Sequence, residues 1–189
     1  GSFREALLED WLGGQDASSL LDVYDDHPYY DDYWAGMNPM SRMGEMTLPI
    51  FHYGGFHDVF AEGTLEGFVT MDAQNGVGEQ RLLMGPWTHV DEGAFSPTQG
   101  ELTYPLDSVL PIGEANPIAW FNRHLRDQRR PLRSLMSRSP VTYYVAGDPE
   151  IDNSAGNYWA EAKSWPPSGL RETRLYLGDG TLGSDLPAS

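Results

Sequence analysis

The chain has 189 residues, of which 40% are hydrophobic and 12% aromatic, so it is long enough to bury a substantial core. Its formal net charge of −16 argues against nucleic acid and anionic membranes as partners, because both would repel it. The lack of cysteine excludes disulfides, thiolate nucleophiles and zinc–thiolate sites. No apolar run is long enough to span a membrane, and 21 glycines and 14 prolines favour a fold rich in turns.

The N-terminal part predicts a helix followed by a polar, aromatic segment. Apolar side chains recur at helical spacing over residues 3–12. Residues 25–34, DDHPYYDDYW, predict a loop that enters a short helix. A histidine among four carboxylates also suggests a metal site, but the segment lacks the alternation of a calcium loop, and its aromatic residues suit packing better. We therefore expect a joint between two parts of the fold there, and no metal.

Strands and helices alternate in the middle of the chain. Apolar runs at 47–55 and 80–87 have the length of buried strands, the second of them broken by a Gly-Pro pair. Helices are expected over residues 61–71 and 116–125, and the stretch 90–111 between them has no clear period. This order predicts the α/β class with a parallel sheet.

After residue 130 the pattern changes. Residues 140–147 and 172–178 alternate like strands and are separated by turns rich in proline and glycine. We therefore expect a separate β module in this part of the chain.

Polar residues gather where the two buried strands are predicted to end. Asp58 follows the first strand and His89 the second, with one helix between them. A right-handed crossover would place these strand ends side by side, where the sites of open α/β sheets lie. A carboxylate bonded to the imidazole Nδ1–H would leave Nε2 free to accept a proton from a nucleophile. The order of acid and then histidine is that of α/β hydrolases, but no Gly-x-Ser-x-Gly elbow occurs in these residues.

The remaining candidates near these strand ends favour structural roles. His57 is next to Asp58, but neighbours in an extended segment point to opposite sides, so we expect it to be structural or part of the pocket lining. His52 is expected to be buried and hydrogen-bonded, His124 to be a helix-end residue, and Trp87 to lie in the core.

Four segments in order resemble one known family. HPYYDDYW, LPIFHYGGFHDVFAEGTLEGF, RLLMGPWTH and PIAWFNRHL are similar to successive motifs of the X-Pro dipeptidyl-peptidase / cocaine-esterase-like (CocE/NonD) acyl hydrolases. The resemblance implies an α/β-hydrolase domain with an inserted helical cap and a C-terminal β jelly roll. It assigns residues 1–46 to the end of the cap and its joint to the core, 47–130 to the C-terminal part of the catalytic domain, and 131–189 to the start of the jelly roll.

The same resemblance implies roles for individual residues. Asp58 matches the triad acid, His89 the triad histidine, and Phe60 a position that can face the acyl pocket. The serine nucleophile and the oxyanion hole belong to the N-terminal half of the family's proteins, which these residues do not include. The chain is therefore expected to be a fragment of a serine hydrolase that acts on small ester, amide or peptide substrates without a cofactor. Its partner would be the missing N-terminal half, and alone it is expected to be inactive.

Two alternatives stay open. The first is a non-catalytic binding or interaction module, and the second is a transacylase on the same fold. Glycan binding, with Asp58 and His89 more than about 10 Å apart, would favour the binding module, and a hydrogen-bonded pair at about 3 Å would favour the enzyme. Only product analysis separates a transacylase from a hydrolase, because the two share a triad.

Overall fold

The computed structural model describes residues 6, 10–13, 18–74, 78–89, 93–110, 117–126, 139–151, 154–178 and 180–186. The chain forms two compact units, Gly1–Met46 and Thr47–Ser189. This division falls at the same position as the boundary drawn from the sequence between the expected cap segment and the catalytic core. The helix expected over residues 3–12 lies mostly outside the described residues.

The first unit is helical in its described part. Its elements are α2 (Ser18–Asp26), α3 (Asp32–Met37) and the 3₁₀ helix η1 (Pro39–Glu45). Asp31 is the N-cap of α3, and its carboxylate accepts hydrogen bonds from the backbone N–H groups of Tyr33 and Trp34. The ring of His27 stacks on Tyr33 at 4.2 Å, and its Nδ1 lies 2.6 Å from Oδ2 of Asp31. The DDHPYYDDYW segment thus folds as a loop that enters a short helix, as predicted.

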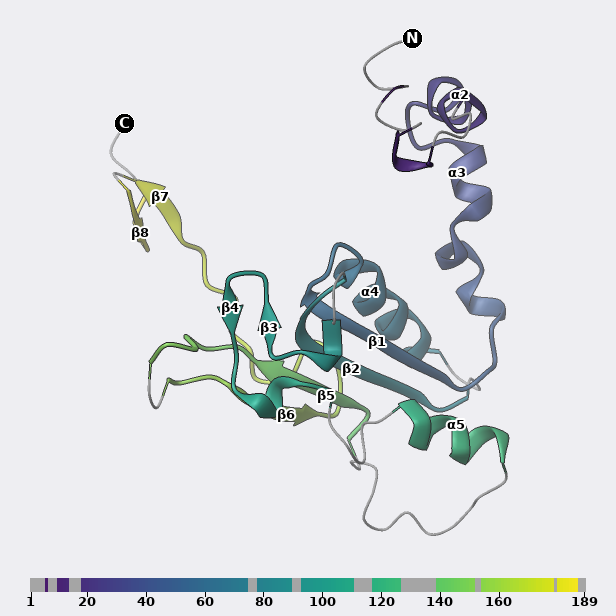
Figure 1. The fold of residues 1–189 in the computed structure, drawn as a ribbon. Helices are drawn as coiled ribbons and strands as arrows, with labels where there is room; N and C mark the ends of the chain where they lie inside the picture. Colours follow the sequence, from purple (N-terminus) through teal and green to yellow (C-terminus); the bar gives the residue numbers. More distant parts are fainter. Residues whose placement is uncertain are drawn as a thin grey trace. The chain divides into compact units, whose positions relative to one another are not determined.

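The second unit is built on a four-stranded sheet with the strand order β1-β2-β5-β6 (Figure 1). The strands are β1 (Ile50–His57), β2 (Gln80–Thr88), β5 (Val141–Val145) and β6 (Tyr158–Ala162). The first three are parallel, and β6 runs antiparallel to β5. The expected α/β class with a parallel sheet is therefore confirmed.

Strand β5 corrects the domain boundary that we predicted near residue 131. We expected residues 140–147 to open a separate β module, but β5 pairs with β2 from Leu82–Val141 to Met84–Tyr143 and continues the same sheet. An alternating apolar pattern predicts a strand but does not identify its partner, which explains the error. Within the described residues after β6, the strands β7 (Tyr176–Gly178) and β8 (Thr181–Gly183) form only a two-stranded hairpin.

Helices pack on both faces of the sheet. They are α4 (Ala61–Asp72), which agrees with the predicted helix 61–71, and α5 (Pro117–Leu125). The ring of His52 contacts Phe68 of α4, whereas the neighbouring Phe51 contacts Trp120 of α5. Because successive side chains of a strand point to opposite faces, the two helices cover opposite sides. None of the described helices is both long and apolar enough to cross a membrane.

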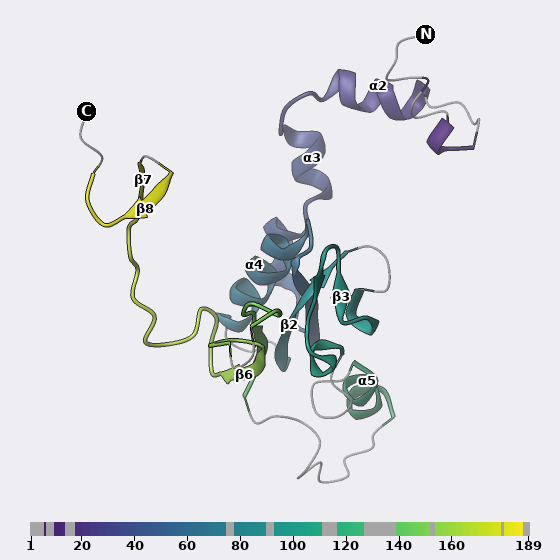
Figure 2. The ribbon, with the colours of Figure 1, turned by 60° about the vertical axis from the view of Figure 1, so that its left-hand side comes forward.

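Within the stretch 90–111, the described residues 93–110 cover the face of the sheet opposite α4 (Figure 2). They contain η2 (Gly93–Phe95), β3 (Thr98–Gln99), β4 (Leu102–Thr103) and η3 (Leu106–Ser108). Trp87 packs with Ala94 in a buried cluster on this face, and its indole N–H donates to the carbonyl of Ser108 at 2.8 Å. Trp87 is 2% exposed, which confirms the expectation that it lies in the core.

Candidate active site

A bulge in β2 determines which residues leave the sheet side by side. The parallel register is regular up to Gly55, which lies opposite Gly85, but His57 then pairs with Thr88. Between these two pairs, β2 therefore advances by three residues and β1 by two. We expected the Gly-Pro pair to break this strand, but the strand continues through Pro86 and absorbs the irregularity as a bulge. The residues that follow the two strands consequently emerge next to each other.

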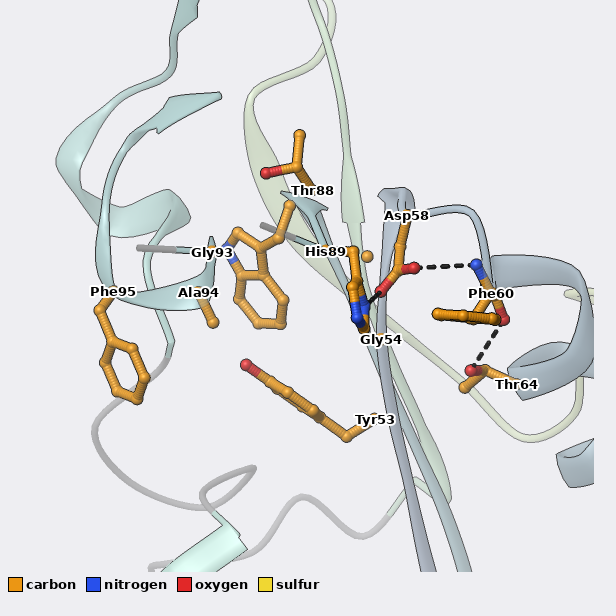
Figure 3. Close-up of a pocket in the computed structure, with 12 residues that line it drawn as sticks. Tyr53, Gly54, Asp58, Phe60, Thr64, Thr88, His89, Gly93, Ala94 and Phe95 are labelled. Atoms are coloured by element: carbon orange, nitrogen blue, oxygen red, sulfur yellow. Dashed lines mark hydrogen bonds and ion pairs between the residues drawn. The ribbon is translucent and has the colours of Figure 1, made fainter. Parts of the chain in front are cut away.

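These two residues, Asp58 and His89, are in hydrogen-bond contact (Figure 3). Nδ1 of His89 lies 3.1 Å from Oδ2 of Asp58. The other carboxylate oxygen, Oδ1, accepts a hydrogen bond from the backbone N–H of Phe60 at 2.8 Å. Both oxygens thus have a partner, and the carboxylate is oriented toward the imidazole. The side chain of Asp58 is 14% exposed and that of His89 is 55% exposed, so the histidine is the accessible member of the pair.

The imidazole of His89 is held at Nδ1 and open at Nε2. The ring of Phe60 meets it edge-on, with a centroid distance of 4.9 Å and an interplanar angle of 75°. Within the described part of the chain, Nε2 has no hydrogen-bond partner, whereas Nδ1 faces Asp58. A neutral imidazole that donates from Nδ1–H carries its lone pair on Nε2. The arrangement can therefore accept a proton from a group placed beside Nε2.

A cavity of about 410 Å³ adjoins this pair (Figure 3). Aromatic side chains contribute much of its wall, namely those of Tyr53, Phe60, Trp87 and Phe95. Burial raises the pKa of Tyr53. A concave, largely apolar site with a few polar groups suits the apolar part of a small molecule.

The two threonine hydroxyls in the cavity wall are already engaged. The hydroxyl of Thr64 donates to the carbonyl of Phe60 at 3.1 Å, and that of Thr88 donates to Oε1 of Gln99 at 3.0 Å. No serine is among the described residues that line the cavity. This part of the site therefore presents a carboxylate and an imidazole, and the protons of its threonine hydroxyls are bound elsewhere.

The histidines expected to be structural have partners of their own. Nε2 of His57 lies 3.2 Å from the hydroxyl of Tyr104. His52 is 9% exposed and its Nε2 lies 3.0 Å from Oε1 of Gln80, so the expected buried, hydrogen-bonded state is confirmed. Burial lowers the pKa of His52. His124 lies in the last turn of α5, as predicted.

Several residues of the site were not predicted from the sequence. Tyr53 could have been recognised, because it alternates with buried His52 and shares a face of β1 with Phe51. Phe95 and Gln99 lie in a segment with no regular period, so the sequence offered no signal for them.

Comparisons with known proteins agree with the family resemblance seen in the sequence. The sequence profile of the family described as X-Pro dipeptidyl-peptidase (S15 family) matches residues 2–91. Cocaine esterase from Rhodococcus sp. (strain MB1 Bresler) is 28% identical over 174 residues, which are 91% of this chain and 27% of that protein. The crystal structure of a CocE/NonD family hydrolase from Staphylococcus aureus aligns with a TM-score of 0.56 and 18% identity, over 88% of this chain and 26% of that one. The likeness to the Staphylococcus aureus structure concerns the fold alone, and the chain spans about a quarter of the length of either relative.

Proposed function

Because the chain belongs to the X-Pro dipeptidyl-peptidase and cocaine-esterase-like family of serine hydrolases, we propose that Asp58 and His89 are the acid and the base of its catalytic triad. The proposed activity is cleavage of an ester or amide bond in a small substrate through an acyl-serine intermediate. The serine and the oxyanion-hole donors would come from residues of the complete protein beyond these 189. Phe60 would contribute to the acyl pocket.

In the acylation step, the carboxylate of Asp58 keeps His89 in the Nδ1–H tautomer. Nε2 then takes the proton of the serine hydroxyl while the serine oxygen bonds to the substrate's carbonyl carbon. The resulting imidazolium is stabilised by the carboxylate, whose Oδ2 lies 3.1 Å from Nδ1. The Nε2–H group next donates its proton to the leaving alcohol or amine as the old C–O or C–N bond breaks, and an acyl-serine remains.

In the deacylation step, water replaces the leaving group. Nε2 of His89 takes a proton from the water, whose oxygen bonds to the acyl carbon. The proton passes to the serine oxygen as the acyl–serine bond breaks, which restores the free enzyme and releases the acid. The aromatic cavity beside His89 is large enough to hold the apolar part of a small acyl group.

The contact between Nδ1 of His89 and Oδ2 of Asp58 carries this proposal. Its length of 3.1 Å matches the separation of about 3 Å that favours an enzyme over a binding module. The family profile also spans both residues. A transacylase would use the same pair, and product analysis in the presence of an amine acceptor separates it from a hydrolase.

Replacing the acid tests the proposal in the complete protein. Asp58→Asn is expected to lower kcat about 10⁴-fold, because an amide can donate to Nδ1 and so favours the wrong tautomer. Asp148→Asn is the matched control, since Oδ1 of Asp148 likewise accepts from a backbone N–H two residues on, at 2.9 Å, but faces no histidine. This control should retain activity within about twofold. A near-normal kcat for Asp58→Asn would remove Asp58 from the triad.

A further inference from the structure

The turn that carries His89 is held by the buried side-chain amide of Gln99. Gln99 lies in β3 and is 5% exposed. Its Oε1 accepts hydrogen bonds from the backbone N–H of Thr88 at 2.7 Å and from the Thr88 hydroxyl at 3.0 Å. Its Nε2 donates to the carbonyls of Gly93 at 2.7 Å and Ser96 at 2.8 Å. Both N–H groups and the oxygen of the amide are therefore used inside the fold.

These bonds act on the backbone directly before the candidate base. Thr88 is the last residue of β2, and His89 follows it beyond the end of the sheet. Gly93 and Ser96 belong to the turn that returns the chain to β3. The amide thus clamps the end of β2 to the backbone at Gly93 and Ser96.

Few other contacts orient the His89 side chain. It is 55% exposed, and among the described residues its ring has one hydrogen bond, to Asp58, and one aromatic neighbour, Phe60. An exposed side chain with so few contacts relies on its backbone for direction. A small rotation at Thr88 would move Nδ1 out of reach of the carboxylate.

We infer that Gln99 is a positioning residue for His89, whose buried amide holds the backbone at Thr88 so that Nδ1 faces Oδ2 of Asp58. This inference deepens the proposed function, and its consequence for catalysis rests on that function. When the clamp is lost, the bond to Asp58 weakens and the imidazole returns to the Nε2–H tautomer that histidine prefers in water. In that tautomer Nε2 already carries a proton and cannot accept one from a serine.

The chain offers a matched pair of substitutions. Gln99→Met removes the amide at similar volume. Gln80→Met does the same at the start of β2, where Gln80 is 6% exposed and its amide bonds to two backbone carbonyls and to His52. Both variants lose a buried amide network, so both should unfold more easily. Only Gln99→Met should alter His89.

The tautomer of His89 gives the direct readout. Two-bond ¹H–¹⁵N correlations report it through the carbon-bound ring protons, in protein with labelled histidine at about pH 8.5, where an ordinary imidazole is neutral. Wild type and Gln80→Met should show His89 protonated on Nδ1, and Gln99→Met should show mainly the Nε2–H form. In the complete protein, kcat of Gln99→Met should fall about 10- to 100-fold with KM within about threefold.

The positioning role of Gln99 and the proposed hydrolase mechanism are tested by different outcomes. An unchanged His89 tautomer in Gln99→Met overturns the positioning role, even if Asp58→Asn proves the triad. A near-normal kcat in Asp58→Asn overturns the hydrolase mechanism and leaves the tautomer result valid.

A second substitution keeps the test decisive if Gln99→Met does not fold. In Gln99→Glu the new carboxyl group faces two carbonyl oxygens and is expected to keep its proton. It can then donate to one carbonyl while its other oxygen still accepts from Thr88. The Nδ1–H tautomer of His89 should therefore be retained, and its loss would show that the bond to Thr88 does not position the histidine.

Discussion

At the scale of single residues, the degree of burial gives chemically identical histidines different roles. His52 is 9% exposed and bonds to Gln80, whereas the side chain of His89 is 55% exposed and faces a carboxylate. Desolvation penalises the charged form of the first, and the second remains accessible for proton transfer. Sequence position alone therefore does not assign the role, and the environment of each ring does.

The buried histidine leads to a prediction about acid stability. Burial lowers the pKa of folded His52 below its ordinary value of 6.5, so below about that pH the unfolded chain binds more protons than the folded one. The free energy of unfolding should therefore decrease as the pH falls through 6.5 toward the folded pKa. Urea unfolding at about pH 8 and about pH 5.5 measures this decrease. His52→Gln, which cannot titrate, should lose less stability over the same interval, and an equal loss would contradict the assignment.

At the scale of elements, the sequence predicted where helices and strands lie better than it predicted which strands pair. The helix predicted over 61–71 is α4, and the helix predicted over 116–125 is α5. The short strands β3 and β4 were missed, because two residues are too few to form a pattern. Strand β5 was predicted but placed in the wrong sheet, since strand pairing depends on tertiary contacts that alternation does not encode.

The candidate site could be predicted only in part for the same reason. Asp58 and His89 were found because each follows a recognisable buried strand, and parallel strands end at one edge of a sheet. The bulge that places Asp58 and His89 next to each other was not predictable, because a Gly-Pro pair normally interrupts a strand. The four hydrogen bonds of Gln99 join an aperiodic segment to the end of β2, and only the folded chain reveals them.

The bulge also makes a prediction about two adjacent glycines. A Cβ added to Gly55 would lie 2.0 Å from the backbone oxygen of Trp87, whereas one added to Gly54 would lie 3.3 Å from the nearest side-chain atom, in Thr64. Gly55→Ala should therefore lower the free energy of unfolding by about 3 kcal/mol or more, because a backbone atom in the bulge must move. Gly54→Ala should cost less than about 1.5 kcal/mol, because flexible side chains can adjust. Equal losses in urea unfolding would show that the bulge tolerates a side chain.

At the scale of the whole molecule, we propose that the chain supplies part of a catalytic apparatus. It spans about a quarter of the length of the two relatives, and its described cavity contains an acid and a base without a serine. We propose that the nucleophile lies elsewhere in the complete protein. The 189 residues alone should then neither hydrolyse esters nor react with a serine-directed phosphonate.

Phosphonate labelling of the complete protein, followed by mass mapping of the modified peptide, tests the central claim most directly. The label should be found on one serine outside residues 1–189, and His89→Gln should slow its attachment at least about 10³-fold, because the serine loses its base. A label within residues 1–189, or an unchanged labelling rate in His89→Gln, would contradict the proposed triad.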